Sequence, residues 1–398
     1  MQFDESVIKS LLNRAKAEGI FSKAVAGFIL PDGTQRLVAL DTPENTVFDI
    51  ASLTKVCPTS TLALSYILEG KLGIDEKVCD YIPELQTNYR DDVRIFHLLT
   101  HSLDYRVPMK TLRTLPPEGI LDALYTYQFE HAPGADFNYG NPASVLLGMI
   151  LCRITGKDLQ QQGRERFFEP LGMTRSGWDP LTRNFNKIEK AEIAPTEICA
   201  FRNREIQGEI HDESAWVLRK LFPVGSAGMF SCVPDLLKFV QMVLNDGIIE
   251  DSQQVPREDS QSKAQAPHEP QRGPCEDLPQ ELREVNGKRR IAPAGILEMV
   301  SQNAFANPEF AALTRAMDAE TRKTACTALG WELNSTKFMG THASPRTFGK
   351  TGFTGASIVA DASAGAAVVL LSNFTYPHRE QNADRIHAFR AALADAFF

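Results

Sequence analysis

The sequence predicts an α/β (α+β) protein in which strands from both ends of the chain form one antiparallel sheet, flanked by terminal helices. Two observations support this fold class. Runs with β character lie at residues 23–40 and again after residue 328, whereas the apolar residues between 52 and about 239 mostly recur at helical spacing. We therefore expect a sheet domain over residues 1–57 and 328–398, with a mainly helical domain over residues 58–327 inserted between its strands.

The N-terminal segment contains signals for one helix and one hairpin. Five aliphatic residues between positions 4 and 18 recur at helical spacing, and Gly19 follows where a C-terminal cap belongs. Two β-like runs, 23–30 and 34–40, are separated by Pro31-Asp32-Gly33, whose residue types favour a tight turn. The pattern predicts an amphipathic helix followed by a β-hairpin.

The second half of the chain combines a polar insertion with a return of β character. Residues 251–290 contain no Phe, Trp or Tyr and few aliphatic side chains. Such a segment cannot bury enough apolar surface to offset the cost of ordering, so we interpret it as a flexible insertion. A short charged helix over 278–285 is the alternative. Strand-like runs follow at 348–359 and 366–371, and a last helix is expected over 379–397.

Composition excludes several classes of function. Hydrophobic residues make up 43% of the 398 residues and charged residues 23%, as in ordinary globular proteins. The net charge of -8 argues against a nucleic-acid partner. No apolar stretch approaches the ~20 residues of a membrane-spanning helix, and the acidic start of the chain does not resemble a signal peptide, so a cytoplasmic location is expected. Seven scattered cysteines without a C-x-x-C pair are interpreted as reduced thiols, with no metal and no cofactor.

The pattern Ser52-Leu53-Thr54-Lys55 places an amine one helical turn from a hydroxyl. The same S-x-x-K spacing recurs by chance at 6–9 and 260–263, but only Ser52 follows an apolar run and opens an apolar helix. The first amides of a helix lack intrahelical partners, and its dipole favours negative charge. Ser52 can therefore act both as a nucleophile and as a backbone donor. The alternative is a helix-capping serine beside a surface lysine.

A second candidate is Tyr139-Gly140-Asn141, a turn that presents a phenol just before the Pro142 of an apolar helix. The alternative is that Asn141 caps this helix while Tyr139 merely packs.

The third candidate is Lys350-Thr351-Gly352, at the start of an extended segment. A phosphate-binding loop is excluded there, because its frame would need glycine at position 344, which is Ser344, and because strand-like sequence follows.

In this order the three motifs resemble those of the serine β-lactamase and penicillin-binding protein superfamily. Tyrosine in the middle motif points to the class C branch, which also contains D,D-peptidases, D-amino-acid peptidases and the family VIII carboxylesterases. Connecting segments look like the family as well: residues 95–102 resemble its HLLTHTSG segment, 168–173 its PLGM segment, 225–239 its GG-x-x-S-x-x-D-x-x-x-F segment, and 349–357 its GHTGFTGTS strand. The resemblance covers most of the chain except the insertion.

The resemblance implies the fold named above and an acyl-enzyme mechanism. Ser52 would attack a carbonyl, and either Lys55 or Tyr139 would take its proton. The remaining roles follow by position: Asn141 would orient Lys55 and the substrate, Lys350, Thr351 and Gly352 would bind it, and the backbone amides of Ser52 and Phe353 would form the oxyanion hole. Because the glutamate of H-E-x-x-H is missing, His97 and His101 are assigned a structural role rather than a metal site. His211-Asp212-Glu213 is interpreted as a polar loop, also without a metal.

The expected substrate is a small-molecule ester, amide or lactam, and the resemblance leaves three functions open. We favour a carboxylesterase on small esters with weak β-lactam hydrolysis, because the expected location and the GFTGAS strand fit the esterase subgroup. The alternative is a D,D-peptidase or class C β-lactamase, since the cation of Lys350 suits a substrate carboxylate. A binding or sensor protein on the same fold is the third.

Overall fold

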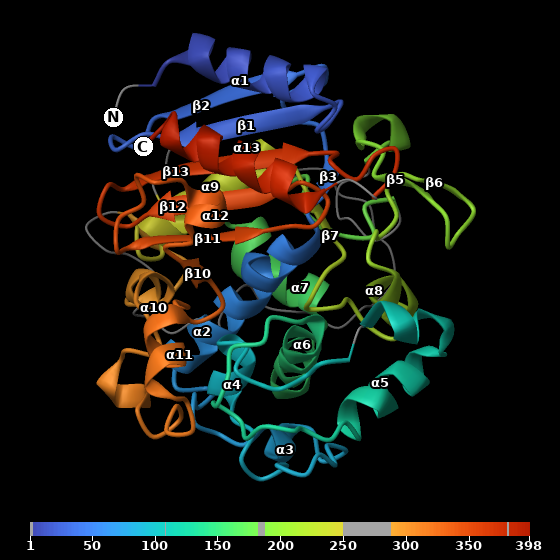
Figure 1. Cartoon of the computed structure of the whole chain (residues 1–398), viewed down its shortest axis with the longest axis vertical. Coiled ribbons are helices and arrows are strands. Elements are labelled where there is room, and N and C mark those ends of the chain that lie inside the picture. Colours follow the sequence, from blue (N-terminus) through green and yellow to red (C-terminus); the bar gives the residue numbers. More distant parts are fainter. Residues whose placement is uncertain (1–2, 108, 182–187, 250–287, 380–381) are drawn as a thin grey trace, which may run out of the picture.

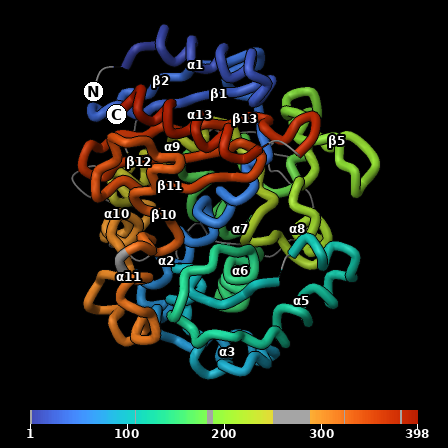
Figure 2. The backbone as a smooth tube through the Cα atoms, in the orientation of Figure 1, coloured from blue at the N-terminus to red at the C-terminus, as the bar shows by residue number. Residues whose placement is uncertain are grey.

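The computed structural model describes residues 3–107, 109–181, 188–249, 288–379 and 382–398. Its main sheet is antiparallel and has the strand order β10-β11-β12-β13-β1-β2. The strands are β1 (Ala24–Ile29), β2 (Gln35–Leu40), β10 (Glu332–Leu333), β11 (Thr347–Thr351), β12 (Ser357–Asp361) and β13 (Ala366–Ser372). Strands from the two ends of the chain therefore lie side by side, as the blue and red segments of Figures 1 and 2 show. The predicted fold class is confirmed, whereas the domain limits stay a prediction.

The terminal helices cover one face of this sheet. Helix α1 (Glu5–Ala17) begins after Asp4, whose carboxylate accepts the Ser6 and Val7 amides, and it ends before the left-handed Gly19, as predicted. Helix α13 (Ala383–Asp395) packs beside it. Alternate residues of β1, such as Phe28, join Ile8, Leu12 and Phe389 in one apolar cluster between these helices and the sheet.

Helix α9 (Val233–Leu244) covers the opposite face, against β1 and β13. Gly27 allows this close approach, since a Cβ atom at that position would lie 2.3 Å from Val233 Cγ1 and 2.9 Å from Leu237 Cδ1. Residues such as Val25 and Leu371 bury their side chains here and join the main core. The sheet is therefore apolar on both faces.

The helical region lies below the sheet in Figure 1. Its helices are α2 (Thr61–Leu68), α3 (Val78–Tyr81), α4 (Ile95–Leu99), α5 (Pro117–Tyr125), α6 (Asn141–Thr155), α7 (Leu159–Gly163), α8 (Glu213–Leu218), α10 (Ile296–Ser301) and α11 (Ala319–Thr324); α12 (Thr336–Met339) packs on α13. The region also contains short strands that were not predicted, and two of its small sheets lie near the site. They consist of β3 (Phe48–Asp49), β7 (Met229–Ser231) and β4 (Gly177–Trp178), and of β5 (Glu197–Cys199) and β6 (Arg204–Ile206). Strands of two or three residues are too short to show an alternating pattern.

Two further sequence interpretations need correction. The run 348–359 is two strands, β11 and β12, joined by a turn at Gly352–Ala356 rather than one extended segment. The C-terminal limit of the predicted insertion is wrong, because Arg289 and Arg290 form β9 (Arg289–Arg290), which pairs with β8 (Ile248–Ile249). The rest of the predicted insertion, up to residue 287, lies outside the described residues. The alternative helix at 278–285 lies outside the described residues.

The helices of the described ranges all lack the combination of length and apolarity that a membrane crossing needs. The six cysteines in those ranges are free, and Cys275 lies outside them.

Candidate active site

Ser52 follows directly on β3, in a strained turn that buried groups hold in place. The Asp49 carboxylate accepts the amides of Ala51 and His211, both at 2.7 Å. Ala51 has a φ of +46°, which is uncommon for a residue with a side chain. The chain then continues as a 3₁₀ helix, Ala51–Lys55, and a π-helical segment, Val56–Ser60, before α2 begins. The predicted helix after Ser52 is therefore present, but its first turns are not α-helical.

The Lys55 ammonium lies between three oxygen atoms. Its Nζ is 3.0 Å from Ser52 Oγ, 2.8 Å from Asn141 Oδ1 and 2.8 Å from the carbonyl oxygen of Ser226. Lys55 is 2% exposed, so the alternative of a surface lysine is wrong. The carbonyl oxygens of Asn141 and Ser226 can only accept hydrogen bonds, so each binds one N–H of Lys55. The third substituent position on Nζ then points at the Ser52 hydroxyl. That third position is a proton when Lys55 is charged and a lone pair when it is neutral.

Asn141 is the first residue of α6, and its amide group is fixed from both sides. Oδ1 accepts from Lys55, while Nδ2 donates to Asp212 Oδ2 at 2.9 Å. Asp212 in turn caps α8, since its Oδ1 accepts the Ala215 amide at 2.8 Å. Gly140, not Asn141, occupies the capping position of α6, so the alternative that Asn141 is a helix cap is wrong. The contact with Lys55 is the one that its expected orienting role requires.

Tyr139 lies between the two lysines, and its side chain is 42% exposed. Lys55 Nζ is 5.3 Å and Lys350 Nζ 4.2 Å from the centroid of its ring. Lys350 comes from β11, is 1% exposed, and forms an ion pair of 3.1 Å with Glu332 Oε1 of the neighbouring strand β10. Two cations and one anion therefore surround the phenol.

Burial and these charges shift the pKa values of Lys55, Tyr139 and Lys350. Burial lowers the pKa of Lys55, and the charge of Lys350 adds to this effect. Although Tyr139 is partly exposed, desolvation of its phenol group would by itself raise the pKa; the two lysines and a hydrogen bond from Ser52 outweigh this effect, so the pKa of Tyr139 is lowered. Burial opposes the charge of Lys350, but Glu332 and Tyr139 raise its pKa. Both candidate bases, Lys55 and Tyr139, are thus easier to deprotonate than usual, whereas Lys350 stays a cation.

The turn after β11 lies against the segment that precedes Ser52. A Cβ atom on Gly352 would be 2.4 Å from the carbonyl oxygen of Ile50, so only glycine fits there. Thr354 Oγ1 donates to the carbonyl oxygen of Asp49 at 2.6 Å. The amides of Phe353 and Ser52 are the two predicted oxyanion donors. These contacts hold the loop that contains Phe353 against the backbone segment that leads to Ser52.

The structure thus connects Ser52, Lys55, Tyr139, Asn141 and Lys350 through direct contacts, and Thr351, Gly352 and Phe353 follow Lys350 along the chain.

Sequence reasoning missed Glu332 and the backbone oxygen of Ser226, and it treated Asp212 only as part of a polar loop. No local pattern marks these residues, although the capping position of Asp212 before α8 is a readable signal.

The predicted structural role of His97 agrees with its contacts. Its Nδ1 accepts the Arg94 amide at 3.0 Å, and its Nε2 lies 3.1 Å from the carbonyl oxygen of Leu313. Both ring nitrogens are therefore occupied. His101 packs edge-on against Tyr139, with ring centroids 4.9 Å apart. Burial and the two lysines lower the pKa of His101 well below its usual range, so its ring is neutral.

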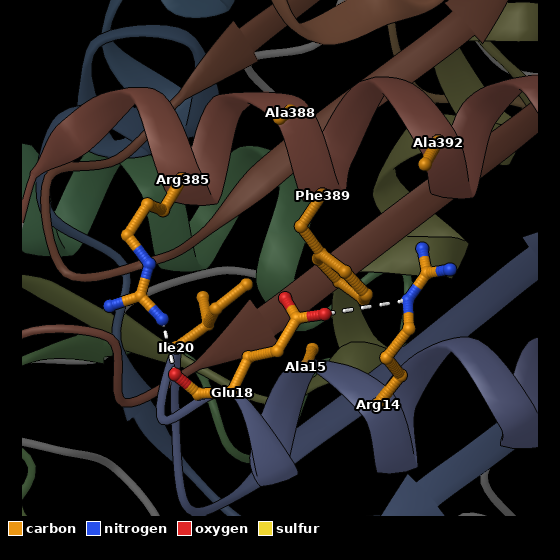
Figure 3. A pocket seen from close by; sticks show the side chains of 8 residues that line it. All are labelled: Arg14, Ala15, Glu18, Ile20, Arg385, Ala388, Phe389 and Ala392. Carbon is orange, nitrogen blue, oxygen red and sulfur yellow. Dashed lines mark hydrogen bonds and ion pairs between the residues drawn. The ribbon is translucent and has the colours of Figure 1, made fainter.

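A separate hollow lies between α1 and α13 (Figure 3). Arg14, Glu18 and Arg385 line it, with Arg14 Nε 3.8 Å from Glu18 Oε1 and Arg385 bonded to the Glu18 carbonyl. It carries none of the three motifs, and its charged groups are used in these contacts.

Comparisons with known proteins agree with this arrangement. The family model described as Beta-lactamase matches residues 34–393. A protein of Escherichia coli (strain K12), provisionally named as a D-alanyl-D-alanine carboxypeptidase, is 26% identical over 361 residues, which cover 82% of this chain and 69% of that protein. Among solved structures, EstCE1, described as a hydrolase with promiscuous acyltransferase activity, has a TM-score of 0.66 at 19% identity over 98% of this chain and 97% of its own. A β-lactamase/D-alanine carboxypeptidase from Pseudomonas syringae has a TM-score of 0.60 at 17% identity over 98% of both chains.

Proposed function

Because the chain belongs to the Beta-lactamase family, whose members are serine hydrolases, we propose that it forms an acyl-enzyme on Ser52 and acts as a carboxylesterase on small esters, with weak β-lactam hydrolysis as a side activity. The observation that carries the acyl-enzyme proposal is the contact of 3.0 Å between Lys55 Nζ and Ser52 Oγ. It gives the hydroxyl a partner that is itself oriented by Asn141 and Ser226. Contacts that run from a nucleophile to a base, and from the base to a group that orients it, are the arrangement that nucleophilic catalysis requires.

The proposed reaction begins when the Ser52 oxygen attacks the ester carbonyl and its proton moves to Lys55 or to the Tyr139 phenolate. The carbonyl oxygen then carries a negative charge, which the amides of Ser52 and Phe353 stabilise. Collapse of this intermediate breaks the bond to the leaving alcohol, which takes the proton back from the base. Water repeats the sequence on the acyl-enzyme and releases the acid.

The preference for esters rests on the charges and the surface of the site. The charge of Lys350 is offset by Glu332, so a neutral substrate does not leave a buried cation unpaired. The open side of the site presents two aromatic side chains, Tyr139 at 42% and Phe353 at 53% exposure, which suit a small apolar acyl group.

A second candidate is a D,D-carboxypeptidase or β-lactamase. The provisional name of the Escherichia coli relative favours it, as does Lys350, a cation of the type that binds a substrate carboxylate.

The test compares kcat/KM of the wild-type protein for a short-chain aryl ester, an N-acyl-D-Ala-D-Ala peptide and a chromogenic cephalosporin. We expect the ester to be the best substrate and Ser52→Ala to lower its turnover by more than about a thousandfold. Ser6→Ala is a matched control, because Ser6 carries the chance S-x-x-K pattern in α1 and should not affect turnover. A higher kcat/KM for the peptide or the cephalosporin would favour the second candidate, and full activity of Ser52→Ala would contradict both.

A further inference from the structure

A buried arginine from the last helix reaches the turn that carries Phe353. Arg390 lies in α13 and is 4% exposed. Its Nη2 donates to the carbonyl oxygens of Gly352 and Ala356, each at 2.8 Å. Among the described residues no carboxylate forms an ion pair with it. A buried cation is costly unless it is hydrogen-bonded, so these two carbonyls are its main compensation.

The two carbonyls close the turn from both ends. Ala356 O also accepts the Gly352 amide at 2.7 Å, and Gly352 O accepts the Gly355 amide at 3.1 Å. A single guanidinium nitrogen thus bridges the first and last residues of the loop, and it fixes the plane of the peptide group that follows Gly352.

That peptide group is the one that matters for the proposed reaction. The carbonyl of Gly352 and the amide of Phe353 belong to the same planar, conjugated unit. A cation bound to the oxygen draws electron density from the nitrogen and makes the N–H more positive. Charge-assisted bonds of this kind are about twice as strong as neutral ones. The Phe353 amide is therefore both held in direction and strengthened as a donor.

We propose that Arg390 is a positioning residue that aligns and polarises the Gly352–Phe353 peptide, so that the Phe353 amide stabilises the oxyanion of the tetrahedral intermediates. This inference rests on the proposed function. Burial lowers the pKa of Arg390 to about 9, so the side chain is still charged at neutral pH.

The experiment compares the wild-type protein with Arg390→Met, which keeps an unbranched apolar side chain in place of the arginine stem and removes the charge and the donors. The readouts are kcat and KM for the aryl ester, and the inhibition constant of a boronic acid, whose adduct with the serine is tetrahedral and places an oxygen in the hole. We expect kcat to fall by about tenfold, equivalent to about 1.4 kcal/mol, with KM changed less than about twofold. The boronic acid should lose affinity by a similar factor. Arg385→Met is the control, since this exposed arginine on the same helix lines the hollow of Figure 3 and should not affect either readout.

A wild-type kcat and a wild-type boronate affinity in folded Arg390→Met would overturn the inference, and so would a change confined to KM. If Arg390→Met does not fold, Arg390→Lys and Arg390→Gln decide. A higher kcat for the lysine variant supports polarisation by the charge, and equal kcat values overturn it.

Failure of the proposed function has a different signature. In that case the wild-type protein shows no Ser52-dependent turnover, and both proposals fall. Ser52-dependent turnover that Arg390→Met leaves unchanged overturns only the role of Arg390.

Discussion

Glu197 provides a quantitative test of the charge network beside the site. This glutamate on β5 is 3% exposed and lies 3.1 Å from His211 Nε2 and 2.5 Å from Arg379 Nε. His211 in turn stacks on Phe353, with ring centroids 5.6 Å apart. Burial would raise the pKa of Glu197, but its close contact with His211 and its hydrogen bonds from Arg379 outweigh burial and lower it from 4.5 to about 2.

The pKa shift of Glu197 can be converted into stability. Each unit of pKa corresponds to about 1.4 kcal/mol, so the ionised carboxylate contributes about 3 kcal/mol to the free energy of unfolding at pH 7. Because the pKa is lower in the folded than in the unfolded chain, this contribution is complete above pH 4.5 and is lost as the pH falls towards 2. At pH 3, about one unit above the folded-state pKa, less than half of this contribution remains.

The assay is urea unfolding of wild type and Glu197→Gln at pH 7 and pH 3. We expect the variant to be less stable by about 3 kcal/mol at pH 7 and by less than half of that at pH 3. Glu165→Gln is the matched control, because Glu165 pairs with Lys157 on the surface, where such pairs contribute about 1 kcal/mol or less. The same deficit for Glu197→Gln at both pH values would refute the reasoning.

Two further predictions follow from the structure. Lys350→Met should move the acid limb of the kcat/KM profile to higher pH, because Lys350 lowers the pKa of Tyr139. Glu332→Gln should move the acid limb to lower pH, because Glu332 raises the same pKa. If the acid limbs of the two variants moved in the same direction, the proposed charge arrangement would be contradicted. Gly27→Ala should lower the free energy of unfolding by about 1–3 kcal/mol in urea, since the new methyl group would collide with Val233 of α9, and an unchanged midpoint would contradict this packing.

The sequence predicts best what is local. The first helix, the hairpin around Gly33 and the last helix follow from periodicity and turn residues within a few positions. The order of the three motifs likewise anticipates that Ser52, Tyr139 and Lys350 meet. The structure adds what comes from distant parts of the chain. Glu332, on a strand of two residues, and Arg390, on the last helix, have no local pattern that points to the site.

The C-terminal end of the polar insertion also depends on a contact between residues that are distant in the sequence. Composition alone extends it to residue 290, because Arg289 and Arg290 look as hydrophilic as their neighbours. Their pairing with Ile248 and Ile249 is a contact across about forty residues, which composition cannot reveal.

The central claim is that Ser52 is the nucleophile. The most direct measurement is to label the protein with an activated organophosphonate that reacts with catalytic serines, digest it, and locate the adduct by mass spectrometry. The account predicts one adduct, on the peptide that contains Ser52, formed at the rate at which ester turnover is lost, and no adduct in Ser52→Ala. An adduct on another residue, or loss of turnover without modification of Ser52, would contradict it.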